Sequence, residues 1–418
     1  MTDSPDFHRR RLCLALAGLP LLAACKPTQG YGLAERKSRW FDERRFTPVT
    51  PLPSTSSFVL GVLPDTQYYS ENNFEMTRTG KRIERYPGLG YPPALAFHAQ
   101  THWLANNAAA LNMPFVVHLG DLVEDAEQHG EWRLASQAMA RLERAGLPYS
   151  VMTGDHDVIA LYTADRSRDD RELFTQYFGR ERAARQATFI ECDVSELNAV
   201  HRFSALGQDF LLLTLDWYPS DQTLDWAQGV LDRYPHLPTI LASHNIVDLV
   251  NGQAVLSNRR NDTGVRLWNR LIRRNNQIFL TLNGHNHGSG HLRLVNDAGQ
   301  PVDLLLINYQ TEYAGGNGLL RLLELDLARG RLEAFTYSPW VAYRQQSGDL
   351  PVRLGSDPRD TYSAEVLAPL ASAQFDSRFV LDVDFASRFA SFGGYTAQVP
   401  ATAEEGVLAR MRQQLGIA

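Results

Sequence analysis

The chain has 418 residues, of which 44% are hydrophobic and 21% are charged, proportions typical of a globular protein. Its formal net charge of −6 indicates no basic surface, so we expect no nucleic-acid partner. A chain of this length can bury a large core and can form one large domain or two ordinary ones. No internal repeat, low-complexity block or clear linker interrupts residues 57–385, which favours one domain.

The first residues have the pattern of an export signal. Arg9, Arg10 and Arg11 precede an apolar run that ends in Leu22-Ala23-Ala24-Cys25. A basic start, a short apolar segment and small residues before a cleavage point are typical of a signal peptide, and this segment is too short to span a membrane stably. Leu-Ala-Ala-Cys resembles the bacterial lipobox, which implies a lipid on Cys25. The alternative is an ordinary signal that happens to end near a cysteine.

We therefore predict a lipoprotein signal peptide at residues 1–24, a tether at 25–56, a folded domain at 57–388 and a C-terminal tail at 389–418. The stretch 25–56 is polar and carries several prolines, as tethers do. On this interpretation the protein is exported and anchored through the lipid on Cys25, on the periplasmic side of the bacterial cell envelope. Export by the general or the twin-arginine route stays open. Cys192 would have no partner in the mature chain, so no disulfide is expected.

Short apolar runs alternate with helical patterns through the first part of the domain. In chain order we predict a strand at 58–63, a helix at 94–111, strands at 115–119 and 149–152 with a helix at 131–145 between them, a helix near 171–178, a strand at 210–215, a helix at 224–234, a strand at 239–242, a helix at 265–274 and a strand at 278–282. This alternation predicts βαβ units and a largely parallel sheet.

From residue 291 to about 336 the pattern changes to strands separated by turn residues, without helices. We predict a second, more antiparallel sheet there. A late strand at 378–385 and a helix near 404–415 close the chain. The predicted fold class is α/β, with two packed mixed sheets flanked by helices.

Side chains of metal-binding types follow five of the predicted strands. They are Asp65 with Gln67, Asp121, Asp155 with His156, His244, and His285 with His287. The carboxyl ends of strands open onto the crevice where α/β proteins place their chemistry. Carboxylate oxygen and neutral imidazole bind zinc-like and harder cations, and this mixture suits a two-metal hydrolytic site with a bridging carboxylate. One strand-end Asp is more often a turn residue, but five such junctions favour a site.

The series resembles the motifs of the calcineurin-like metallophosphoesterases, which are Asp-x-His, Gly-Asp, Gly-Asn-His-(Asp/Glu), a later His and Gly-His-x-His. The matching segments here are Asp65-Thr66-Gln67, Gly120-Asp121, Gly154-Asp155-His156-Asp157, His244 and Gly284-His285-Asn286-His287. The match spans about residues 58–290. Four further motifs resemble those of a secreted bacterial branch of this family and extend the likeness to about residue 385. They are Asp-Thr-Gln, Thr101-His102-Trp103, Gly315-Gly316-Asn317-Gly318 and Thr336-Tyr337-Ser338-Pro339.

This resemblance implies a four-layer αββα fold and an exported enzyme that hydrolyses a phosphate ester or anhydride. The nucleophile would be a hydroxide bridging two metal ions, both divalent or one trivalent, such as Mn, Fe or Zn. The first ion would lie among Asp65, Gln67, Asp121 and His287, and the second among Asp121, Asp155, His244 and His285. The phosphorylated substrate is of unknown class. The alternative is a non-catalytic cell-envelope lipoprotein that uses the same fold for binding.

The resemblance also implies that His156 protonates the leaving oxygen or binds the phosphoryl charge. Glu124, Asp125 or Asp157 would orient its ring, and the sequence does not choose among them. Asp121, as the shared bridge, and His156 are therefore the predicted catalytic residues.

Two positions depart from the common pattern of this family. Gln67 stands where many members have His, and an amide oxygen is the weaker ligand. Asp155 replaces the usual Asn and adds a negative charge, so we expect tighter metal binding and weaker phosphate binding. Some further polar residues are predicted to be structural (His98, His102 and His118), and others are candidates for substrate contacts (Tyr68, Arg259, Arg260 and Asn317).

Overall fold

The computed structural model describes residues 56–72, 74–76, 81–86, 89–159, 172–258, 262–347, 378–397 and 405–416, with isolated positions between 42 and 54 and at 399. These residues belong to one compact unit, Asp42–Ala418. Among them, no helix is both long and apolar enough to cross a membrane. The predicted signal peptide and Cys25 lie outside the described residues.

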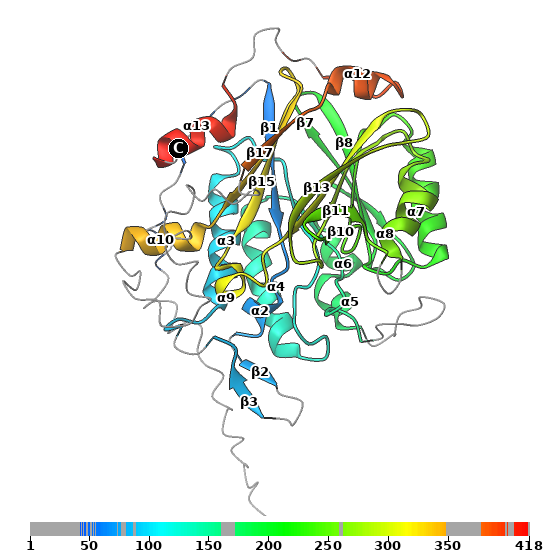
Figure 1. The fold of residues 1–418 in the computed structure, drawn as a ribbon. Coiled ribbons are helices and arrows are strands. Elements are labelled where there is room, and N and C mark those ends of the chain that lie inside the picture. Colours follow the sequence, from blue (N-terminus) through cyan, green and yellow to red (C-terminus); the bar gives the residue numbers. More distant parts are fainter. Residues whose placement is uncertain are drawn as a thin grey trace, which may run out of the picture. The chain divides into compact units, whose positions relative to one another are not determined.

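Two large mixed sheets form the centre of this unit (Figure 1). The first consists, in spatial order, of β17 (Arg378–Asp382), β16 (Arg331–Tyr337), β15 (Leu320–Asp326), β1 (Ser57–Leu63), β4 (Phe115–His118) and β5 (Tyr149–Val151). Strands β1, β4 and β5 are parallel, whereas β15, β16 and β17 add antiparallel pairs on the other side of β1.

The second sheet consists, in spatial order, of β13 (Gly288–Val295), β14 (Pro301–Asn308), β12 (Ile278–Asn283), β9 (Thr239–Ser243), β8 (Gln208–Leu215), β7 (Ala199–Ala205) and β6 (Phe189–Cys192). Its four central strands, β14, β12, β9 and β8, are parallel, and antiparallel strands flank them on both sides.

The two sheets pack against each other through alternate apolar residues of their strands, because successive side chains of a strand point to opposite faces. Phe58, Leu60 and Val62 of β1 are fully buried in one cluster with residues of the second sheet such as Leu212 and Leu282. Each such side chain stabilises the fold by about 1.5–3 kcal/mol. This shared core fixes how the ends of the two sheets lie relative to each other.

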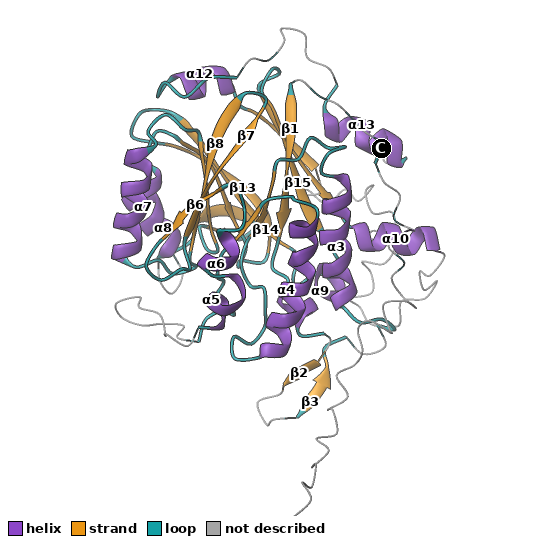
Figure 2. Cartoon of the chain, turned by 180° about the vertical axis from the view of Figure 1, so that it is seen from behind, coloured by secondary structure: helices purple, strands orange, loops and turns teal. Residues whose placement is uncertain are grey.

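Helices cover the outer faces of both sheets (Figure 2). On the first sheet, α3 (Ala94–Asn107) approaches so closely that a Cβ at Gly61 would lie 2.9 Å from Leu104 Cδ2. On the second, α7 (Asp221–Arg233), α8 (Thr263–Leu267) and the π-helical turn Trp268–Ile272 share a buried cluster with the strands. The predicted class of two mixed sheets flanked by helices is confirmed.

The remaining elements are several helices, most of them short, and two hairpins. The helices are α2 (Gln67–Ser70), α4 (His129–Arg144), which packs beside α3, α5 (Leu173–Phe178), α6 (Arg180–Ala183), α9 (Tyr313–Gly316), α10 (Pro339–Ser347), α12 (Phe385–Ala390) and α13 (Val407–Leu415). Two hairpins are formed by β2 (Phe74–Met76) with β3 (Arg82–Glu84) and by β10 (Val247–Val250) with β11 (Gln253–Leu256).

Parts of the stretches predicted as a tether and a tail pack onto the domain. Leu52 is buried, and its amide donates to the Ala110 carbonyl at 3.0 Å. At the other end, Val407 and Leu408, the first residues of α13, donate their amides to the buried Glu324 carboxylate at 2.6 and 2.9 Å. A carboxylate at a helix N-terminus satisfies donors that have no partner within the helix.

The prediction of a separate antiparallel sheet from residue 291 onward is wrong. Strands β13 and β14 extend the second sheet, and β14 runs parallel to β12. Strands β15 and β16 join the first sheet beside β1. The local pattern predicted the strands correctly but not their partners, because pairing with a distant strand depends on which faces are buried together.

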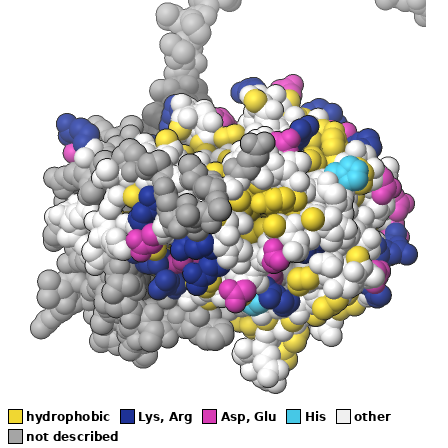
Figure 3. All heavy atoms as spheres, turned by 90° about the horizontal axis from the view of Figure 1, so that it is seen from above, with side chains coloured by type: hydrophobic (Ala, Val, Ile, Leu, Met, Phe, Trp, Pro, Cys, Tyr) yellow, Lys and Arg dark blue, Asp and Glu magenta, His cyan; other side chains and the backbone are white. Residues whose placement is uncertain are grey.

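The face at the α12 end of the strands carries acidic and basic side chains side by side, with hydrophobic ones among them (Figure 3). The carboxyl end of β1 points the other way, toward α2 (Figure 1), and β4 and β5 run parallel to β1. The candidate ligands Asp65, Asp121 and Asp155 follow the carboxyl ends of these three strands.

Candidate metal centre

The carboxyl ends of five parallel strands meet at one place, three from the first sheet (β1, β4 and β5) and two from the second (β9 and β12). Among the described residues, three groups have ligand atoms within 4.8 Å of one another: Asp155, His244 and His285; Asp65, Asp121 and His244; and Asp121, Asp155 and His156. Asp121 and Asp155 each belong to two groups, as does His244. The structure thus brings together one predicted site residue from every one of the five strand ends.

Asp121 lies at the centre of these groups. Its backbone has a φ of 50°, in the left-handed region that Asp tolerates better than most residues. Its Oδ1 accepts a hydrogen bond from the His156 amide at 3.0 Å, and its Oδ2 accepts one from Gln67 Nε2 at 2.9 Å. Gly154 makes room for it, because a Cβ there would lie 1.9 Å from Asp121 Oδ1.

Asp65 is held by the second sheet although it follows a strand of the first. Its Oδ2 accepts hydrogen bonds from the His285 amide at 3.1 Å and from Asn308 Nδ2 at 2.9 Å. Its Oδ1 is buried without a hydrogen-bond partner. Gly284 permits this approach, since a Cβ there would lie 2.1 Å from that oxygen.

Asn308 was not predicted as a site residue. It ends β14, and its amide also donates to the His285 carbonyl at 3.0 Å. The sequence held one signal for it: like the predicted ligands, Asn308 is a polar residue that closely follows an apolar run, here Leu304-Leu305-Leu306-Ile307. Because this region was predicted to form a separate sheet, the end of this strand was not expected to lie beside the other strand ends.

His244 is fully buried and has one ring nitrogen directed at the carboxylates. Its Nδ1 donates to the Leu119 carbonyl at 2.7 Å, because a carbonyl can only accept. Its Nε2 has no hydrogen-bond partner and lies 3.4 Å from both Asp121 Oδ1 and Asp155 Oδ1. A histidine whose Nδ1 is bound to a carbonyl presents its Nε2 lone pair to a metal.

The electrostatics of the site also favour a cation. Burial raises the pKa of Asp65 well above its usual range. Burial alone would lower the pKa of His244, but the carboxylates of Asp121 and Asp65 outweigh it and hold that pKa well above its usual range. Burial would raise the pKa of Asp155, but the neighbouring rings of His244 and His285 outweigh it and hold that pKa below its usual range.

The residues present therefore fit a metal. The buried atoms Asp65 Oδ1, Gln67 Oε1 and His244 Nε2 all lack a hydrogen-bond partner. Carboxylate oxygen, amide oxygen and imidazole nitrogen are all metal ligands. Cations bound among them would satisfy all three and would offset the charge of the neighbouring carboxylates.

Glu124 is the acidic residue that contacts the ring of His156. His156 Nδ1 donates to the Glu124 carbonyl at 3.0 Å and lies 3.3 Å from Glu124 Oε2. Burial alone would lower the pKa of His156, but the carboxylates of Asp121 and Glu124 outweigh it and raise that pKa to about 9. This arrangement keeps His156 protonated at neutral pH.

Asp157 and Asp125, the other two residues predicted as candidates to orient His156, accept hydrogen bonds from backbone amides instead. Asp157 accepts hydrogen bonds from the Val123 and Gly154 amides, at 3.0 and 2.8 Å, and so connects the loops after β4 and β5. Asp125 accepts from the Glu127 amide and from Gln128 Nε2.

His287 is not brought into these groups. Its side chain is exposed, and it belongs to none of the three groups of ligand atoms found among the described residues. His118 is buried, and its two ring nitrogens bind Thr66 Oγ1 and the Gly120 amide, as expected of a structural histidine. Among the candidates for substrate contacts, Asn317 accepts a hydrogen bond from the Tyr91 hydroxyl, and Arg259 and Arg260 lie outside the described residues.

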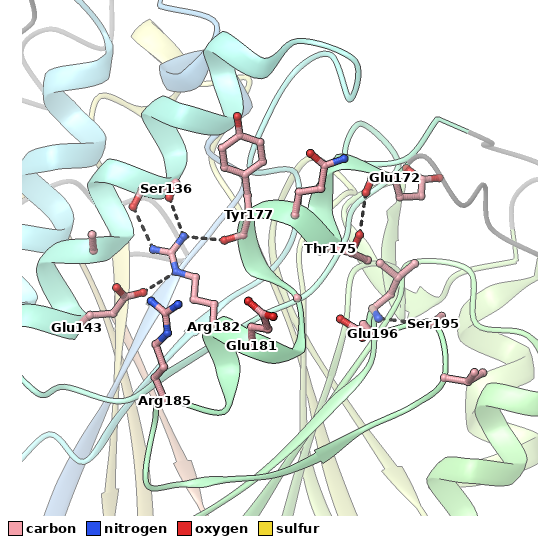
Figure 4. A pocket seen from close by; sticks show the side chains of 15 residues that line it. Ser136, Glu143, Glu172, Thr175, Tyr177, Glu181, Arg182, Arg185, Ser195 and Glu196 are labelled. Atoms are coloured by element: carbon pink, nitrogen blue, oxygen red, sulfur yellow. Dashed lines mark hydrogen bonds and ion pairs between the residues drawn. The ribbon is translucent and has the colours of Figure 1, made fainter.

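A cavity of about 900 Å³ is lined by a different part of the chain, α4 to α6 and the segment 194–197 (Figure 4). Several of its polar groups pair with one another. Arg182 lies 2.6 Å from Glu143 and donates to Ser136 Oγ and to the Tyr177 carbonyl. None of the predicted site residues lines this cavity.

No model of a protein family matches the chain. It is 28% identical over 295 residues to YvnB, an uncharacterized protein of Bacillus subtilis strain 168, which covers 69% of this chain. The chain spans only 20% of that protein's length.

Solved structures also resemble the chain. A 5'-nucleotidase precursor of Thermus thermophilus has 16% identity and a TM-score of 0.37, over 70% of this chain and 59% of its own. An uncharacterized protein of Streptococcus pneumoniae, described as a predicted phosphoesterase, has 9% identity and a TM-score of 0.24, over 68% of this chain and 91% of its own. Likenesses this weak say nothing about the activity of this chain.

Proposed function

We propose that the protein is a metal-dependent phosphoesterase of the calcineurin-like kind. The observation that supports the proposal best is the set of buried, unpaired ligand atoms beside Asp121, namely Asp65 Oδ1, Gln67 Oε1 and His244 Nε2. A buried polar atom without a partner costs about 1–3 kcal/mol, which a bound cation would offset. The order of the motifs along the chain supports phosphate chemistry at these metals.

The proposed ligands are those that the resemblance implies. Asp65, Gln67, Asp121 and His287 would hold one ion, and Asp121, Asp155, His244 and His285 the other. Two such ions, for example Mn, Fe or Zn, would supply Lewis acidity that polarises a phosphate oxygen and lowers the pKa of water. His287 lies outside the clustered groups, so binding of the first ion would require its side chain to turn inward.

The residues of the chain would then orient the substrate and move the proton. His156 would present its ring to the leaving oxygen as the proton donor. Since its Nδ1 binds the Glu124 carbonyl, Nε2 is the ring nitrogen that remains for a substrate oxygen. A positioned acid of this kind typically contributes about 10²–10⁴-fold to a reaction rate.

We further propose that the protein acts outside the cytoplasm, attached to the membrane by a lipid on Cys25. Only the sequence of the first 25 residues supports this proposal. Mass spectrometry of the mature amino terminus tests it, with Cys25→Ser as the variant expected to leave the membrane fraction. A mature chain that begins elsewhere and carries no lipid would contradict it.

The test of the enzymatic proposal is hydrolysis of a monoester and a diester, p-nitrophenyl phosphate and bis-p-nitrophenyl phosphate, after loading with Mn, Fe or Zn. We expect turnover with at least one metal. Occupied metal sites without turnover of either reporter would instead favour a lipoprotein that uses the fold for binding.

A further inference from the structure

Arg85 is a residue that no motif predicted, and it lies directly after the β2–β3 hairpin. Its Nε lies 2.6 Å from Glu71 Oε2, and its Nη2 lies 3.2 Å from Glu124 Oε1. Its guanidinium carbon lies 3.9 Å from the centre of the Tyr68 ring. The Arg85 side chain is only 18% exposed. Two carboxylates and an aromatic face thus hold the guanidinium in one orientation.

Glu124 connects Arg85 to the reacting end of the site. One carboxylate oxygen, Oε1, contacts Arg85, and the other, Oε2, lies 3.3 Å from His156 Nδ1. The Glu124 amide donates to Glu131 Oε2 at 2.8 Å, which fixes the backbone separately. The terminal torsion of a Glu side chain is soft, so an ion pair on one oxygen determines where the other points.

We propose that Arg85 is a positioning residue for the reaction: it orients the Glu124 carboxylate, and Glu124 orients the His156 ring toward the leaving oxygen. This inference rests on the proposed phosphoesterase function. It requires no contact between Arg85 and the substrate.

The proposal has a consequence for the choice of substrate. When the hydroxide adds to phosphorus, the bond to the leaving oxygen breaks, and that oxygen takes the bonding electron pair and a proton from His156. The next water loses a proton to become hydroxide, and this proton restores His156. An alkoxide needs this proton far more than p-nitrophenolate does, because the alcohol is the much weaker acid. Misplacing His156 should therefore slow alkyl esters most.

The test compares Arg85→Gln, Arg85→Lys and Arg182→Gln on an alkyl phosphate monoester and on p-nitrophenyl phosphate. Arg182 is a matched control, since it lies 2.6 Å from Glu143, stacks 4.3 Å from the Phe178 ring centre and is 14% exposed. For Arg85→Gln we expect kcat to fall at least about tenfold on the alkyl ester and under about threefold on the nitrophenyl ester. KM and metal content should not change, Arg85→Lys should recover part of the loss, and Arg182→Gln should match the unmodified protein.

Three results would overturn the proposal: equal losses on both esters, a loss confined to KM, or a loss of the same size in Arg182→Gln. A measurement independent of turnover is the ¹⁵N spectrum of the histidine rings, with the His156 signal assigned by its absence in His156→Gln. Arg85→Gln should shift or broaden that signal. If the unmodified protein hydrolyses nothing, the phosphoesterase proposal fails, whereas an unchanged His156 signal overturns the role of Arg85.

Discussion

Two regions of the molecule collect charged side chains, and they do so in opposite ways. In the cavity of Figure 4, Arg182 pairs with Glu143 and with main-chain and side-chain oxygens of its neighbours. At the strand ends, Asp65 Oδ1 and His244 Nε2 are buried with no hydrogen-bond partner. The cavity offers space, but Arg182 and Glu143 in it already satisfy each other. The strand ends offer ligand atoms that a further cation would satisfy.

The pKa values of two acidic groups, one from each region, shift in opposite directions. Burial raises the pKa of Asp65 well above its usual range. Burial also acts to raise the pKa of Glu143, but hydrogen bonds from Tyr149 and Arg182 hold it below its usual range. Glu143 thus has its partners in place at the cavity, whereas Asp65 is a buried carboxylate with no hydrogen-bond donor for its Oδ1. Unbalanced buried charge is the better marker of a functional site.

The largest effect is expected from Asp121→Asn, which removes the charge shared by the clustered groups. Bound metal should be lost, and kcat should fall by at least about 100- to 1,000-fold. The fold should persist, because Asn has nearly the same shape and can still accept the His156 amide. Metal analysis, phosphatase kinetics and circular dichroism check these outcomes. Glu143→Gln in the cavity is the control and should keep its metal, and a fully active Asp121→Asn would defeat the proposed site.

A smaller effect is expected from Asn308→Ala, which removes one donor to Asp65. Partners that orient a metal ligand are worth about 10- to 100-fold in metal affinity, and calorimetric titration with Mn²⁺ measures the loss. Asn275→Ala is the matched control, because its amide donates to the Leu271 carbonyl and to Gln228. That control should lower stability and leave metal affinity unchanged. Equal metal affinity in both variants would mean that Asn308 does not orient a ligand.

Asp155→Asn should weaken the binding of metal and strengthen the binding of a phosphate substrate. The variant removes one negative charge beside His244 and His285. We expect metal binding to weaken roughly tenfold and KM for a phosphate monoester to fall, because a less negative site attracts a dianion more strongly. Metal titration and steady-state kinetics measure the two effects. If neither quantity changes, the expected role of Asp155 is wrong.

The smallest effect is expected from the pH dependence of the stability that the Glu143 ion pair in the cavity contributes. The pKa of Glu143 is lower in the folded state than its ordinary value of 4.5, so its ion pair stabilises the protein above that value. This contribution disappears as pH falls through the folded-state pKa. The Glu143 side chain is 33% exposed, so less than about 1 kcal/mol is at stake. Urea unfolding at pH 7 and pH 3.5 should show a smaller acid loss for Glu143→Gln than for the unmodified protein.

The sequence by itself determined which residues stand at the strand ends. Buried strands are continuous apolar runs, so the polar residues that closely follow each run are visible without any tertiary information. This is why Asp65, Asp121, Asp155, His244 and His285 could be predicted as one set. The fold class followed from the same local patterns, because alternating runs and helical segments lead to sheets flanked by helices.

Only the tertiary structure decided how those strands pair and which side chains support the candidate ligands. The partition of β13 to β16 between two sheets, the contact of Asn308 with Asp65 and the choice of Glu124 for His156 all join residues that are distant along the chain. Asp65 and Asn308 are 243 positions apart. A local pattern encodes burial and period but not a distant partner, and hydrogen bonds between such residues form only after the two sheets share a core.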